Sequence, residues 1–95
     1  MDSERLSRLF KALGDENRIR IVRLIAESGE LCACKILAEF DLAQPTLSHH
    51  MKTLRTAGLV TARKEGRWIH YALAPGALEE IASFAAALSD PHLRP

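Results

Sequence analysis

Two cysteines separated by a single residue are the most reactive side chains in this 95-residue chain. Cys32 and Cys34 flank Ala33, in a segment whose apolar spacing predicts a short helix. Both thiols would then lie in the first helical turn, where the helix dipole and the neighbouring Lys35 favour the thiolate. Thiolate is the form of cysteine that binds soft metal ions and reacts with oxidants.

The same pair has a plainer interpretation, because buried free cysteine commonly serves as a small apolar side chain. A disulfide across one intervening residue would close a very small loop and would be strained, although it is possible. We therefore expect free thiols and a reducing, cytoplasmic setting. Residues two apart on a regular helix point about 200° apart. Binding one ion through both sulfurs would then require distortion of that turn.

A second group of side chains is polar and basic. Between Gln44 and Leu73 there are five basic residues and one acid, which gives +4, whereas the rest of the chain carries −3 and the whole chain +1. This distribution is typical of a small nucleic-acid-binding domain, although a solvated charged face would look the same. The residues expected to contact bases or phosphates are Gln44, Thr46, Ser48, His49, His50, Lys52, Arg55, Arg63, Lys64 and Arg67, with His50 on the flank of its helix.

The elements that must position these residues follow from apolar periodicity. It predicts five helices, the second capped by Asp15, over residues 3–13, 15–27, 31–40, 45–56 and 75–89. Alternating residues on either side of Lys64-Glu65-Gly66 predict a β-hairpin over 59–73. The predicted fold is a single domain, mainly α with a small β-hairpin, in the order of a winged helix-turn-helix. Its 45–56 helix would enter the major groove and its hairpin would reach neighbouring phosphates.

Four segments together resemble the ArsR family of metalloregulatory repressors: 9–18, 30–34 (Glu-Leu-Cys-Ala-Cys), 44–51 and 63–71. The resemblance implies a homodimer that leaves its double-stranded operator DNA when an effector binds. It also implies that Cys32 and Cys34 bind arsenite or antimonite as the inducer. By the same resemblance the first and last helices form the dimer interface, through Leu6, Leu9, Phe10, Leu13, Leu78, Ile81, Ala85 and Leu88.

The chain departs from the family pattern at two positions. Leu37 stands where the arsenic-responsive relatives often carry a third cysteine, and arsenite prefers three soft donors, so an outside ligand would be needed. Ala43 stands where relatives often place a serine that caps the recognition helix, and losing such a cap costs roughly 1 kcal/mol. The last helix also lacks the carboxylate and histidine set that zinc-sensing relatives use.

Three alternatives remain open at this point. The same repressor fold could carry a thiol redox or persulfide switch at Cys32 and Cys34. A Cys-x-Cys oxidoreductase would lack the expected βαβ context and would leave the basic hairpin unexplained. A winged-helix protein-interaction module would leave both cysteines inert. We expect a regulator rather than an enzyme, with no membrane partner, because no apolar run approaches about 18 residues.

Overall fold

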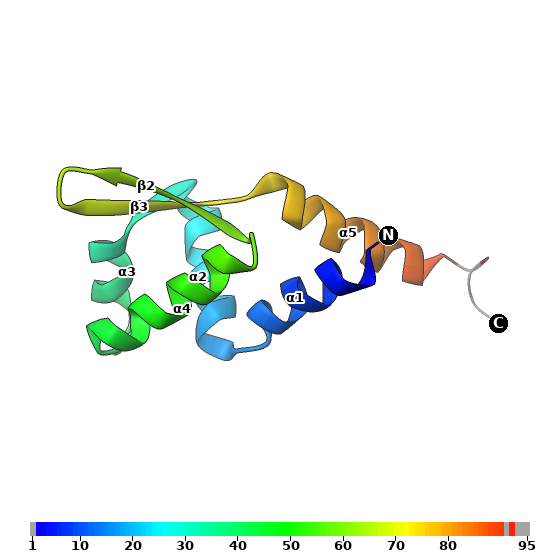
Figure 1. Ribbon diagram of the computed structural model, residues 1–95, viewed down its shortest axis with the longest axis horizontal. Helices are drawn as coiled ribbons and strands as arrows, with labels where there is room; N and C mark the ends of the chain where they lie inside the picture. Colours follow the sequence, from blue (N-terminus) through cyan, green and yellow to red (C-terminus); the bar gives the residue numbers. More distant parts are fainter. Residues whose placement is uncertain (1, 91, 93–95) are drawn as a thin grey trace.

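The computed structural model describes residues 2–90 and 92, and within them it has five helices and three strands. In chain order these are α1 Ser3–Leu13, α2 Glu16–Ser28, β1 Glu30–Cys32, α3 Ala33–Glu39, α4 Gln44–Thr56, β2 Val60–Glu65, β3 Trp68–Leu73 and α5 Pro75–Ser89. The molecule is elongated, with the β2–β3 hairpin reaching toward one end and α5 running to the other (Figure 1). The predicted fold class, mainly α with a small hairpin, is confirmed.

Local capping explains where the first two helices begin. The Asp2 carboxylate accepts hydrogen bonds from the backbone N–H groups of Glu4 and Arg5 at 3.0 and 3.2 Å. Asp15 caps α2 as predicted, accepting from the Arg18 N–H at 3.1 Å. Helix α4 begins at Gln44, and its N-cap residue Ala43 makes no side-chain cap, so the cap that a serine could supply is missing there.

The segment predicted as one helix over 31–40 is divided, and this prediction was wrong at its N-terminal end. Glu30–Cys32 form strand β1, and α3 begins only at Ala33. Strand β1 pairs antiparallel with β3, with Leu31 opposite Tyr71 and Cys32 opposite His70, so the sheet order is β1-β3-β2. A three-residue strand is too short to show a period, and its pairing partner lies about forty residues further along the chain.

One hydrophobic core joins the helices to the base of the sheet. The largest fully buried side chains come from all of α1 to α4 and from the turn before β2: Leu9, Ile21, Ile25, Ile36, Met51, Leu54 and Leu59. Leu9 is completely buried and Leu6 is 6% exposed within the single chain. These two side chains therefore pack inside the protomer, which disfavours their predicted place in a dimer interface.

Helix α5 is attached to the rest of the fold mainly through α1. Arg5 pairs with Glu80, and the rings of Phe10 and Phe84 meet edge to face at 5.6 Å between centroids. Ala77 is the buried hydrophobic residue of α5. Among the described residues no helix is both long and apolar enough to cross a membrane.

Candidate DNA interface and cysteine site

Helix α4 separates its apolar and polar side chains in the way that groove recognition requires. Leu47, Met51 and Leu54 are buried, while the opposite face exposes the predicted contact residues Gln44, Thr46, Ser48, His49, Lys52 and Arg55. Short polar side chains together with Lys52 and Arg55 on an exposed helix face suit base edges and phosphates. The structure thus brings six of the seven predicted α4 residues onto one exposed surface.

His50 is the exception, because its side chain is only 8% exposed. In the part of the chain that the structure describes, its Nδ1 has no hydrogen-bond partner. The pKa of the nearby Asp15 lies below its usual value, chiefly because the carboxylate accepts the Arg18 N–H, with His50 making a smaller contribution. His50 is therefore mostly buried within the single chain and lies within electrostatic reach of Asp15. Its burial disfavours the DNA contact expected from the sequence, which stays a prediction.

The hairpin carries the three predicted basic residues, all exposed: Arg63, Lys64 and Arg67. Arg63, however, is engaged. Its guanidinium donates to Glu30 Oε1 of β1 and to Glu65 Oε2 of the hairpin, each at 2.6 Å. These hydrogen bonds hold the pKa values of both carboxyls below their ordinary value and raise that of Arg63. The Glu30–Arg63–Glu65 cluster thus ties the hairpin to the strand that ends in Cys32.

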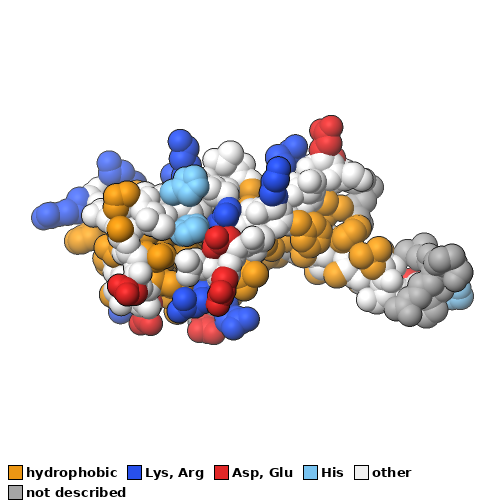
Figure 2. Space-filling model, turned by 90° about the horizontal axis from the view of Figure 1, so that it is seen from below, with side chains coloured by type: hydrophobic (Ala, Val, Ile, Leu, Met, Phe, Trp, Pro, Cys, Tyr) orange, Lys and Arg blue, Asp and Glu red, His pale blue; other side chains and the backbone are white. Residues whose placement is uncertain are grey.

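A basic cleft extends the surface of α4 toward α1. It has a volume of about 500 Å³, and its lining includes Arg8, Lys11 and Arg18 as well as His49 and Lys52 of α4. Figure 2 shows lysine and arginine side chains along one long edge of the molecule, with histidine beside them. Sequence reasoning missed Arg8, Lys11 and Arg18 because they lie outside the +4 segment. The sequence feature that could have indicated them is the Arg8–Lys11 pair, because residues three apart lie next to each other on a helix.

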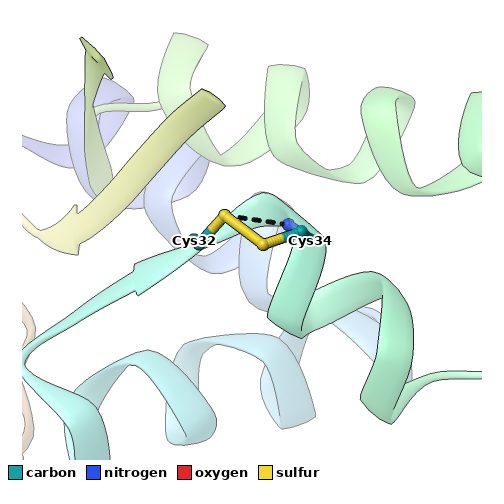
Figure 3. The surroundings of a disulfide bond; sticks show 2 residues. All are labelled: Cys32 and Cys34. Atoms are coloured by element: carbon teal, nitrogen blue, oxygen red, sulfur yellow. Dashed lines mark hydrogen bonds between the residues drawn. A yellow bond between two sulfur atoms is a disulfide. The ribbon is translucent and has the colours of Figure 1, made fainter. Parts of the chain in front are cut away.

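The two cysteines lie at the junction of β1 and α3. Cys32 ends the strand and is the N-cap of the helix, while Cys34 is the second helical residue. Their Cα atoms are 5.2 Å apart and the sulfurs are joined as a disulfide, with the Cys34 N–H donating to Cys32 Sγ at 3.3 Å (Figure 3). The expectation of free thiols was wrong, as was the expectation that both cysteines lie in one helical turn.

The physical reason is the extended backbone at Cys32, with φ −67° and ψ 140°. This conformation turns the chain between the two residues, so the side chains approach each other rather than diverging as they would on a regular helix. Once reduced to thiolates, both sulfurs would therefore be able to reach one ion without unwinding α3. Among the described residues no group of three or more His, Cys, Asp or Glu is placed to hold a metal ion, so the soft donors here are these two.

A second cleft connects the cysteine site to the DNA-facing elements. It has a volume of about 490 Å³ and lies between α3, α4 and β3. Cys34 and Leu37 come from α3, Ser48 from the exposed face of α4, and Arg67 and Trp68 from the hairpin. The sensor candidate, the recognition helix and the wing therefore share one surface depression.

The remaining residues predicted for the dimer interface divide by exposure. Phe10 and Leu88 are 41% and 59% exposed, and Ala85 is also exposed. Leu13, Leu78 and Ile81 are half-buried and pack against the core. Among these predicted interface residues, the apolar side chains that remain exposed are thus on α1 and on the distal half of α5.

A helix pair followed by a basic hairpin, with a polar exposed second helix, defines a winged helix-turn-helix protein. The sequence model of bacterial regulatory proteins of the arsR family matches residues 15–62, and the chain belongs to this family.

The comparisons with individual proteins agree with that membership. The chain is 45% identical over 82 residues to the arsenical resistance operon repressor of Escherichia coli, covering 86% of this chain and 67% of the repressor. It is 46% identical over 78 residues to an HTH-type transcriptional regulator of Methanocaldococcus jannaschii, covering 82% and 88%. A solution structure from Mycobacterium bovis, the homodimeric winged helix-turn-helix DNA-binding domain of a possible ArsR-family regulator, superposes with a TM-score of 0.73 at 28% identity, covering 96% and 83%.

Proposed function

We propose that this protein is a cytoplasmic, non-enzymatic transcriptional repressor, released from its operator when trivalent arsenic or antimony binds Cys32 and Cys34. The observation that carries the proposal is the position of the two sulfurs. They adjoin each other at the β1–α3 junction, beside a cleft that also includes residues of α4 and β3. Two cysteine sulfurs, once reduced, are a donor set suited to soft ions such as trivalent arsenic. The arsenical resistance repressor of Escherichia coli supports the choice of inducer.

Double-stranded operator DNA is the proposed partner of the basic edge. The exposed polar face of α4 would read base edges, while Lys64 and Arg67 would reach neighbouring phosphates. Arg8 and Lys11 of the basic cleft extend the same surface and would contact phosphates further along the duplex. Binding through this many cations releases counterions, so it should weaken steeply with salt.

The route from sensor to DNA runs through the sheet in this proposal. Cys32 pairs with His70 in the β1–β3 ladder, and Glu30 of the same strand holds Arg63 of the hairpin. A ligand that draws Cys32 and Cys34 into a new geometry would therefore shift β1, and with it the wing. This differs from the distortion of a helical turn that the sequence predicts, because Cys32 precedes the helix.

A homodimer is the proposed assembly, with α1 and α5 supplying the interface. Phe10, Ala85 and Leu88 expose apolar side chains on these helices, and burying them in a partner would remove them from water. The homodimeric relative from Mycobacterium bovis supports this assembly.

The disulfide between Cys32 and Cys34 supports a second candidate, a thiol redox switch on the same repressor. Oxidation of two thiols to the disulfide releases two protons and two electrons, which a peroxide or a small-molecule disulfide would accept. In this version oxidation, rather than arsenic, would move β1.

One fluorescence-anisotropy titration on the protein's own promoter tests both candidates. The reduced protein is titrated with arsenite, antimonite, zinc, cadmium, a persulfide and a peroxide in parallel. Arsenite and antimonite should release the DNA, and Cys32→Ser or Cys34→Ser should abolish release while leaving DNA binding intact. Release by peroxide or persulfide alone would select the redox switch. A cysteine variant that still responds normally to arsenite would place the sensor elsewhere.

A further inference from the structure

The cleft beside Cys34 is mainly apolar. Most of its wall is hydrocarbon, and Leu37, Trp68 and Ile69 lie in it together with Cys34. Trp68 is 51% exposed, which leaves a large aromatic face open to a ligand. Cavities of about 150 Å³ hold benzene in other proteins, whereas this open cleft measures about 490 Å³. An alkyl or aryl group attached to an atom held by Cys34 therefore has room here.

The number of donors at the site points to the same kind of ligand. Leu37 lies three residues after Cys34, on the same side of α3, and offers carbon where a third sulfur would be needed. Arsenite, As(OH)₃, has three exchangeable hydroxyls, so two protein thiols leave one of them unsatisfied. A monosubstituted trivalent arsenical, R–As(OH)₂, has two exchangeable hydroxyls and one carbon substituent that does not exchange.

We propose that the Cys32–Cys34 site takes monosubstituted organic trivalent arsenicals in preference to arsenite, with the organic substituent seated against Leu37, Trp68 and Ile69. The inference rests on the proposed arsenic response of this thiol pair. A reductant, a phosphine or a dithiol, first opens the disulfide to two thiols. R–As(OH)₂ then forms two As–S bonds, each S–H proton leaves with one hydroxyl as water, and arsenic keeps its oxidation state.

The test uses the full chain reduced with a phosphine, which adds no competing thiol. Phenylarsonous acid, methylarsonous acid and arsenite are titrated separately. Trp68, the chain's single tryptophan, reports on the cleft by its fluorescence, and intact mass confirms loss of two waters for each bound organic arsenical. Dithiothreitol serves as a reference dithiol with no cleft. For each dithiol we compare the affinity for phenylarsonous acid with that for arsenite. This ratio should be about 10-fold or more higher for the protein than for dithiothreitol, the scale expected of an apolar pocket.

Two variants at position 37 separate donor number from side-chain size. Leu37→Cys adds a third thiol and should tighten arsenite at least 10-fold, which reduces the preference for the phenyl compound. Leu37→Ser introduces a side chain similar in size to cysteine but without the soft donor. It should leave arsenite affinity unchanged while weakening binding of the phenyl compound. Thermal melting checks that both variants fold. If they do not, Trp68→Ala, at a half-exposed position, should weaken the phenyl compound and spare arsenite, as measured by equilibrium dialysis.

The outcomes distinguish this inference from the function on which it rests. If the phenyl preference matches that of dithiothreitol, or if Leu37→Ser and Trp68→Ala leave it unchanged, the cleft does not select the substituent and the inference is wrong. Arsenite release of operator DNA in the anisotropy assay would then still support the proposed repressor. If no arsenical binds the reduced pair, both proposals fail.

Discussion

Adjacent histidines on α4 have opposite environments. His49 is exposed on the face that would meet DNA, whereas His50 is 8% exposed and packs near Asp15. Helical spacing from Leu47 placed His49 outward correctly, but it left His50 on the flank, where rotation alone cannot decide burial. Whether a flanking side chain is buried depends on the elements packed around it, which the spacing along one helix does not reveal.

These neighbours provide a matched pair of substitutions. His49→Ala should weaken binding to the operator more than binding to random DNA, because it removes a base-edge contact, and should leave thermal stability unchanged. His50→Ala should instead lower the free energy of unfolding by about 1–2 kcal/mol, because it leaves a cavity under α4. A shift of about 4–8 °C in melting temperature per kcal/mol is expected for a domain of this size.

Anisotropy on both DNA sequences and a thermal melt provide the readouts. A stable His50→Ala protein with selectively lost operator affinity would return His50 to the DNA-facing set.

The elements of the fold were largely predictable, and the exception matters for function. Helices α1, α2, α4 and α5 were expected within one or two residues of their observed ends, because caps, glycines and prolines mark them locally. Strand β1 was not, because its three residues are specified by pairing with β3. That missed strand determines the cysteine geometry, since an extended Cys32 can meet Cys34. It also supplies Glu30, which no local pattern joins to Arg63.

Glu30→Gln tests whether β1 acts on the wing. The substitution weakens the hold of β1 on Arg63, and Glu65→Gln is the matched control, because it changes the net charge equally while leaving the Glu30 contacts in place. Both variants should bind DNA somewhat more tightly at low salt, as each removes one negative charge from the hairpin region. Only Glu30→Gln should reduce the ratio of DNA affinities without and with arsenite. Equal ratios for both variants would exclude this route.

The pH dependence of the Glu30–Arg63–Glu65 cluster has a definite sign. The arginine holds the pKa of both carboxyls below their ordinary value of 4.5, so the cluster is fully formed above that pH. Its contribution is lost only as pH falls through the lowered values. Protonation of this cluster should therefore not change the ratio of DNA affinities measured without and with arsenite between about pH 6 and 8.

At the scale of the whole molecule, the surfaces proposed for DNA and for a second copy are spread along a 51 Å long axis. The hairpin and α3 lie toward one end of this axis and α5 runs to the other (Figure 1). The cysteine cleft lies between α3, α4 and β3, and the basic surface continues from α4 to Arg8 and Lys11 of α1. Phe10 of α1 and Leu88 of α5 expose apolar side chains. Apolar periodicity predicted a stripe on each of these helices. The periodicity could not predict which residues of a stripe are buried in the protomer's own core and which stay exposed. Leu9 and Phe10 are adjacent in the stripe of α1, yet Leu9 is buried and Phe10 is exposed.

Leu88→Asp tests the proposed interface. Leu88 is 59% exposed, so a charge there is tolerated in the monomer but would be buried in the proposed dimer. The variant should shift from dimer to monomer in size-exclusion chromatography with light scattering and should bind a two-half-site operator at least 10-fold more weakly. Ser83→Asp, exposed on the side of α5 away from Leu88 and Ala85, should remain dimeric. A dimeric Leu88→Asp protein would place the interface elsewhere.

The position of Cys32 at the end of β1 has a consequence for how such regulators diversify. The side chains proposed to choose the ligand, at positions 34, 37 and 68, are distinct from those proposed to read bases, at positions 44, 46, 48, 49 and 52. The two sets meet along one cleft but share no residue. Effector choice and operator choice can then vary by separate substitutions, so a new inducer specificity could arise in one step while the set of regulated promoters stays the same.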